Sequence, residues 1–396
     1  MTPPPLSLYV HLPWCVRKCP YCDFNSHTAG TAPPRQRYID ALLRDLAREA
    51  SRADGRTLTS VFLGGGTPSL FPPQEIGQLL KGVRALFTLA EDIEITMEAN
   101  PGTVECGAPA GYRDAGVNRL SIGAQSFDDA LLRTLGRIHN GDDIARAYDA
   151  ATQGGFDNIN IDLMHGLPGQ NVEMAMRDLK AAVALGPTHL SWYQLTLEPN
   201  TVFYARPPAG LPDEDLAFAI QDCGQALLAA EGYRQYEVSA YARDGRHCRH
   251  NLNYWEFGDY LAVGAGAHGK LTTSHGVQRY QKPANPMMYM QVQEAGEPGT
   301  AATTLTDDDL LFEFMLNALR LNRGFDEAIF VERTGLPAAR LGEASGRARQ
   351  KGLIERRDSG IWTPTELGSR FLNDLLAEFL GPGTENSFMH KAATKP

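Results

Sequence analysis

The chain has 396 residues, of which 43% are hydrophobic, and its formal net charge is −10. This length and composition accommodate one large domain with a sizeable core and a second, smaller domain. No basic face that would bind a nucleic acid stands out in the sequence. The opening residues lack a signal-peptide pattern, and no apolar run approaches the ~20 residues of a membrane helix, although peripheral membrane contact stays open.

Three cysteines follow the first apolar run of the chain. Residues Leu6–Leu12 predict a buried strand, and Cys15, Cys19 and Cys22 come soon after it at the spacing CxxxCxxC. Four thiolates would close a [4Fe-4S] cluster, so three leave one iron open for an outside ligand. A zinc site and redox thiols are the alternatives, but zinc sites usually show a second ligand group, and the nearest one here is at residues 247–250.

Apolar runs and helical patterns alternate through the first half of the chain. Helical spacing of apolar residues marks the stretches 34–51 and 76–87. Because strands that alternate with helices pair in parallel, we expect an α/β fold. Polar residues of interest fall at or just after strand ends, where α/β barrels place their active sites. The predicted strands are 6–12, 57–63, 93–97, 118–122, 158–163 and 189–195.

The organisation changes after the proline-rich stretch 199–212. A helical pattern followed by a small hairpin predicts a mostly helical, winged-helix-like domain at the C-terminal end. From residue 301 onward, 12 Lys and Arg stand against 14 Asp and Glu, which fits a packing or partner module better than a DNA-binding one. The expected divisions are 1–240 for the core, 241–305 for a connecting segment, 306–380 for the C-terminal domain and 381–396 for a mobile tail.

Two strand ends carry candidate binding residues. Residues Gly64–Pro68 read Gly-Gly-Gly-Thr-Pro after the second predicted strand. Glycines there let backbone amides approach a ligand closely, although an ordinary tight turn would give the same pattern. Glu98 follows the third predicted strand, beside a turn. A lone glutamate is usually a solvated surface group, but this position makes Glu98 a candidate site residue.

The stretch from Tyr9 to Cys15, together with Cys22–Phe24, resembles the radical SAM superfamily. More narrowly, the chain looks like the group of oxygen-independent coproporphyrinogen III oxidases and HemW-type haem chaperones, and the resemblance recurs in separate motifs over nearly the whole chain. It implies a partial (β/α)6 barrel, with which the six predicted strands agree. It also implies a [4Fe-4S] cluster whose open iron chelates the amino and carboxylate groups of S-adenosylmethionine.

The resemblance assigns further residues to the S-adenosylmethionine site. The glycine run looks like the loop that receives the methionine end of this cofactor. The other residue types suit the task, because arginine can fork onto a carboxylate, aspartate can hold ribose hydroxyls and glutamine can meet an adenine edge. Plain packing is the alternative for the two tyrosines. The residues that match family positions are Tyr9, Tyr21, Gly65, Gly66, Thr67, Glu98, Gln125, Arg137 and Asp162.

One position departs from the oxidase pattern. The oxidases carry CxxxCxxCxC, whereas this chain has Phe24 at the last position. The three cluster ligands remain, but the oxidase assignment is placed in doubt. Residues 250–255, His-Asn-Leu-Asn-Tyr-Trp, look like the HNxxYW signature of the HemW-type haem chaperones, and residues 191–195 and 264–269 also read as sequences of that group.

The HNxxYW motif supplies a candidate haem ligand. A histidine near aromatic residues is the type of group that ligates haem iron while the rings cover the porphyrin. His250, with Tyr254 and Trp255 behind it, is therefore the haem candidate, and a hydrogen-bonded core histidine is the alternative. His268, in the glycine-rich stretch, is a further candidate.

Two functions from different classes are compatible with these motifs. The first is a haem chaperone, a carrier that binds haem and transfers it to an apo-haemoprotein such as a respiratory enzyme. The second is an oxygen-independent coproporphyrinogen III oxidase, which decarboxylates propionates by radical chemistry. Phe24 and the His250 motif favour the carrier, without the oxidase activity. Thiols that hold a cluster need a reducing compartment, which indicates the cytoplasm.

Overall fold

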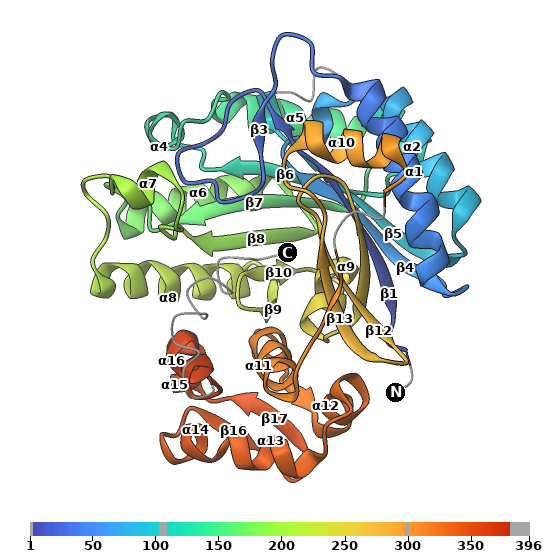
Figure 1. Ribbon diagram of the computed structural model, residues 1–396. Coiled ribbons are helices and arrows are strands. Elements are labelled where there is room, and N and C mark those ends of the chain that lie inside the picture. Colours follow the sequence, from blue (N-terminus) through green and yellow to red (C-terminus); the bar gives the residue numbers. More distant parts are fainter. Residues whose placement is uncertain (1–2, 103–108, 298–300, 381–396) are drawn as a thin grey trace.

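The computed structural model describes residues 3–102, 109–297 and 301–380, so the expected tail 381–396 lies outside the described residues. Within these residues, the main sheet has twelve strands in the order β14-β13-β12-β11-β1-β4-β5-β6-β7-β8-β10-β9 (Figure 1). Seven neighbouring strands are parallel: one, β11, comes from the later part of the chain, and the other six confirm the predicted α/β fold with a partial (β/α)6 barrel. These six are β1 (Leu6–Leu12), β4 (Leu58–Gly65), β5 (Leu89–Ala99), β6 (Arg119–Gln125), β7 (Ile159–His165) and β8 (His189–Gln194).

Burial on both faces explains the continuous apolar run of β1. This strand lies between β4 and a parallel strand that enters from the far end of the chain, and only Tyr9 along it is partly exposed. Helices pack on the barrel strands with one apolar face each. They are α1 (Arg35–Ala53), α2 (Pro73–Leu86), α3 (Pro109–Ala115), α4 (Asp129–Thr134), α5 (Gly141–Gln153), α6 (Val172–Leu185), α7 (Val202–Ala205) and α8 (Glu214–Ala230).

Segment 241–305, expected to connect two domains, extends the main sheet beyond β1. Strand β11 (Asp259–Val263) pairs in parallel with β1, and β12, β13 and β14 continue from it in antiparallel order. Asp259 is fully buried and holds this edge together, because its carboxylate accepts from Lys270 Nζ at 3.1 Å and from Arg56 Nη1 at 2.8 Å. The other elements of the segment are α9 (Arg249–Trp255), β12 (His268–Thr273), β13 (Gly276–Gln281), α10 (Pro286–Ala295) and β14 (Thr303–Thr304).

The C-terminal domain is mostly helical and carries a small sheet, as predicted. A capping box of Thr306 and Asp309 starts its first helix, and an apolar core shared with Phe257 and Val277 fixes the domain to the barrel. Figure 1 shows it at one end of the main sheet. Its elements are α11 (Asp307–Ala318), β15 (Phe325–Asp326), α12 (Glu327–Thr334), α13 (Ala338–Ala344), α14 (Gly346–Gln350), β16 (Ile354–Arg356), β17 (Ile361–Pro364), α15 (Glu366–Arg370) and α16 (Leu372–Ala377).

Short elements complete the fold around the cysteine loop and the far edge of the sheet. They are β2 (Trp14–Cys15), β3 (His27–Thr28), a 3-10 turn at Pro68–Leu70, β9 (Arg234–Glu237) and β10 (Ala240–Ala242). Because β2 pairs with β3, the cysteine loop is closed at its base by two short strands. Among the described residues, no helix is both long and apolar enough to cross a membrane.

Candidate functional site

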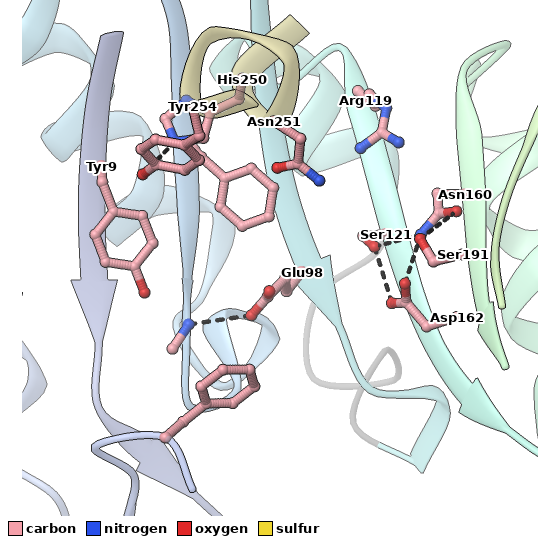
Figure 2. Close-up of a pocket in the computed structure, with 13 residues that line it drawn as sticks. Tyr9, Glu98, Arg119, Ser121, Asn160, Asp162, Ser191, His250, Asn251 and Tyr254 are labelled. Carbon is pink, nitrogen blue, oxygen red and sulfur yellow. Dashed lines mark hydrogen bonds between the residues drawn. The ribbon is translucent and has the colours of Figure 1, made fainter. Parts of the chain in front are cut away.

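A cavity of about 170 Å³ lies inside the barrel, and all six barrel strands contribute to its wall. It brings together five residues predicted from sequence, while Arg119, Ser121, Asn160, Ser191 and Asn251 also line it. Figure 2 shows Glu98 and Asp162 on different strands, with Tyr9 and Tyr254 at the side of the cavity nearer to Glu98. The predicted residues that line this cavity are Tyr9, Gly65, Glu98, Asp162 and His250.

The three predicted cluster cysteines are free, half-buried thiols, and each has a polar neighbour. Thr67 Oγ1 donates to Cys15 Sγ at 3.3 Å, and Arg137 Nη1 lies 3.7 Å from Cys19 Sγ. Cys22 Sγ lies 3.5 Å from a serine hydroxyl. Burial raises the pKa of Cys15 and of Cys22, and the hydroxyls of Thr67 and Ser26 oppose this shift.

No three His, Cys, Asp or Glu side chains in the described part of the chain are gathered closely enough to hold one metal ion. A zinc ion needs all its ligand atoms within about 2.0–2.3 Å of one centre. An iron–sulfur cluster instead distributes its thiolates over several irons.

The glycine run brings the end of β4 against the end of β1. The amide of Gly65 donates to Glu98 Oε2 at 3.0 Å, and the next two amides donate to carbonyls of residues 12 and 14 at 2.8 Å each. A Cβ atom at Gly65 would lie 2.3 Å from the ring of His11, and its backbone has a φ of +108°. The glycines thus permit a close approach of two strands, and all three amides already have protein partners.

Glu98 and Asp162 place two carboxyl groups in one enclosed space. Burial, and then the charge of Asp162, raise the pKa of Glu98 from 4.5 to about 8, although the amide of Gly65 opposes this shift. Burial also raises the pKa of Asp162. Two carboxyl groups that are costly to ionise form a site that a cationic ligand would stabilise. The α-ammonium and sulfonium of S-adenosylmethionine are such cations, so the residues present fit this cofactor.

A polar network around Asp162 was not predicted from the sequence. Ser121 Oγ donates to Asp162 at 2.9 Å, and Asn160 Nδ2 donates to both of them at 2.7 Å. Next to this network, Arg119 is only 2% exposed and its Nε has no hydrogen-bond partner among the described residues. The signal was a pair of polar residues two positions apart at the start of each strand, Arg119 and Ser121 in β6 and Asn160 and Asp162 in β7, because such residues point to one face of the sheet.

His250 is a hydrogen-bonded histidine inside the core, with 1% of its surface exposed. Its Nδ1 lies 2.9 Å from Ser60 Oγ, and its Nε2 lies 2.9 Å from the hydroxyl of Tyr254. Each ring nitrogen of His250 therefore has a hydroxyl partner, and the hydroxyl of Ser60 also bonds to that of Ser7. Ligation of haem iron by His250 would therefore require one of these bonds to break.

Three other predicted residues, Arg137, Gln125 and Tyr21, do not line the cavity inside the barrel. Arg137 donates to the carbonyl of Gly123 at 2.7 Å and lines a small hollow with Cys19 and Thr67. Gln125 has a φ of +72°, which is rare outside glycine, and accepts from the hydroxyl of Tyr193 at 2.8 Å. The last of the three, Tyr21, packs with its ring centroid 6.4 Å from that of Phe203.

The variant Glu98→Gln should make stability less dependent on pH. The folded protein holds the Glu98 proton up to about pH 8, whereas the unfolded chain releases it near pH 4.5, the ordinary pKa of a glutamate. Folding therefore takes up protons between these values, and the free energy of unfolding falls as the pH rises through this window. One carboxyl can contribute a slope of at most about 1.4 kcal/mol per pH unit.

Urea unfolding of the protein without added cofactors, measured from about pH 5 to pH 8, tests this expectation. Glu98→Gln should make the free energy of unfolding fall less steeply with rising pH. The pH dependence that remains in this variant comes from other groups such as Asp162. Glu173→Gln is the control, because Glu173 lies in an exposed ion pair with Arg177. A Glu98→Gln variant with the complete wild-type slope would contradict the assignment.

The fold resembles a solved structure of a porphyrin enzyme. The coproporphyrinogen III oxidase HemN from Escherichia coli, a radical SAM enzyme, superposes with a TM-score of 0.79 at 26% sequence identity. The superposition covers 95% of this chain and 90% of that one. Residues 9–182 match the model of the Radical SAM superfamily, and residues 305–371 match the HemN C-terminal domain.

Sequence relatives extend over nearly the whole chain. The heme chaperone HemW of Escherichia coli K12 is 48% identical over 379 residues, covering 95% of this chain and 98% of the relative. The heme chaperone HemW of Haemophilus influenzae is 48% identical, with coverage of 95% and 98%. That of Bacillus subtilis is 31% identical, with coverage of 95% and 99%. The chain therefore belongs to the HemW heme chaperone family of radical SAM proteins.

Proposed function

We propose that the protein is a haem chaperone, which binds haem and transfers it to apo-haemoproteins such as respiratory enzymes. The observation that carries this proposal is the position of Phe24. This ring stands where the oxidases carry a further cysteine, is 47% exposed, and lines both the cavity in the barrel and a larger one beside it. An apolar ring at this place supports binding of a flat, largely apolar cargo next to the cysteine loop.

The radical SAM centre is the second part of the proposal. Cys15, Cys19 and Cys22 would hold a [4Fe-4S] cluster, and Glu98 and Asp162 would face the cationic part and the ribose of S-adenosylmethionine. When bound, the cluster supplies the electron that cleaves S-adenosylmethionine in radical SAM proteins. In this protein the centre would support haem binding or transfer. A chain with free thiols at such a centre needs a reducing compartment, so the proposed location is the cytoplasm.

Porphyrinogen decarboxylation is the alternative function, because the fold resembles that of HemN with a TM-score of 0.79. The three cysteines and the cavity would also suit such an enzyme. Phe24 favours the carrier, since an oxidase of this group has a thiol at that position. A shared fold leaves the choice between these functions to the residues of the site.

The cluster can be tested by iron content. Anaerobically reconstituted wild-type protein should carry about four irons per chain, and replacing Cys15, Cys19 or Cys22 by alanine should abolish the cluster absorbance. Cys223→Ala is the matched control, because Cys223 is a free cysteine exposed on α8, away from the loop. Stoichiometric zinc with no iron in the wild type would contradict the cluster assignment.

The two functions are separated by one preparation and two assays. Cluster-loaded, reduced protein with S-adenosylmethionine should give no decarboxylated product from coproporphyrinogen III. Titration of the same preparation with haem should give a saturable change of the Soret band. Repeated turnover to protoporphyrinogen IX, or the absence of saturable haem binding, would overturn the carrier function.

A further inference from the structure

A second cavity, of about 420 Å³, opens beside the cysteine loop. Cys22 and Phe24 line it on one side, and His268, at the start of β12, lines it as well. Tyr9, Phe24 and Tyr254 line both this cavity and the smaller one in the barrel. The two spaces therefore adjoin, with aromatic rings between them.

The loop that leads to His268 is held against the cysteine loop by Asn25. The side-chain amide of Asn25 donates to the carbonyls of Ala265 and Ala284 at 2.9 Å and 2.8 Å. A Cβ atom at Gly266 would lie 2.3 Å from Asn25 Nδ2, so a glycine is needed for this approach. Because both loops are fixed to each other, the position of His268 relative to the cysteines is set by the fold.

The three histidines that line the larger cavity differ in their hydrogen bonds. His11 uses both ring nitrogens, with the hydroxyl of Tyr9 at 3.0 Å and the carbonyl of Asn25 at 3.0 Å. His27 Nε2 lies 3.2 Å from the side-chain oxygen of Asn25. The half-buried ring of His268 has no hydrogen-bond partner among the described residues. Only a nitrogen with a free lone pair can bind iron, and His268 is the one of these three rings that gives up no hydrogen bond by doing so; the ring of His27 also has a backbone hydrogen bond to Ala284.

The surroundings of His268 suit a ferrous or ferric porphyrin. Burial, and then the charge of Arg279, lower the pKa of His268, so its ring is neutral and able to ligate a metal at pH 7. Phe24 and Tyr254 offer apolar rings to a porphyrin face. Lys18 lines the same cavity and offers a cation to a carboxylate such as a porphyrin propionate.

We infer that His268, and not the buried His250, ligates the iron of haem in the cavity of about 420 Å³ between the cysteine loop and β12. The inference rests on the proposed function, because it takes haem as the cargo. It assigns the HNxxYW histidine to the core, where His250 joins Ser60 and Tyr254 and supports the wall that both cavities share. Haem then lies beside the radical SAM centre without displacing a buried hydrogen bond.

His268→Ala is the decisive variant, with His275→Ala as the matched control. His268 makes no side-chain hydrogen bond within the described structure, so its removal should leave the fold intact, which circular dichroism and iron content can verify. His275 is an exposed histidine in the turn after the same strand. Each full-length protein is titrated with ferric and ferrous haem, and the Soret position and dissociation constant are recorded. Free imidazole is then added.

For His268→Ala we expect a shifted Soret band and an affinity for haem reduced about tenfold or more. Added imidazole should restore the wild-type Soret band of this variant. His275→Ala should show no change in either quantity. Wild-type spectra and affinity in His268→Ala would overturn the inference while the carrier function stands. A loss in a folded His250→Ala alone would move the ligand to that residue. If the wild type itself shows no saturable haem binding, the proposed function fails and this inference fails with it.

Discussion

The site depends on the close packing of the end of β1 between two glycine-containing turns. On one side, a Cβ atom at Gly65 would lie 2.3 Å from the ring of His11. On the other side, a Cβ atom at Gly264 would lie 2.4 Å from the carbonyl oxygen of His11. Both glycines have a positive φ, so no other residue fits without strain. In the first turn, the backbone amide of Gly65 donates a hydrogen bond to Glu98, and the second turn leads to His268. One strand end thereby fixes the cysteine loop and both cavities.

The barrel was predictable because its strands are buried on both faces and read as short apolar runs separated by helical patterns. The six predicted strands and the helical C-terminal domain were confirmed. The exception is β11, which the sequence presents as five residues inside a glycine-rich stretch, so its pairing with β1 was not foreseen. Partners so distant in sequence leave no local pattern, and the domain divisions proposed from sequence stay predictions.

The site was predictable where residue type and strand position agree, as for Glu98 and Asp162, which line one cavity. Cofactor and haem roles of the predicted residues stay predictions. The sequence could not tell that both nitrogens of His250 have partners, because Ser60 and Ser7 come from distant strands. The sequence also could not show that the ring of His268 has no hydrogen-bond partner among the described residues. The hydrogen-bond partners of a histidine depend on how the chain packs, whereas a sequence motif gives only the residue type.

Transfer of haem to a client is the direct test of the carrier function. Haem-loaded protein is mixed with a respiratory apo-haemoprotein in the presence of excess apomyoglobin, which traps any haem that is released into solution. If the protein is a haem carrier, the client should gain its haem spectrum and activity despite the trap. Appearance of all the haem in myoglobin, with no more client activity than free haem gives, would contradict the carrier function.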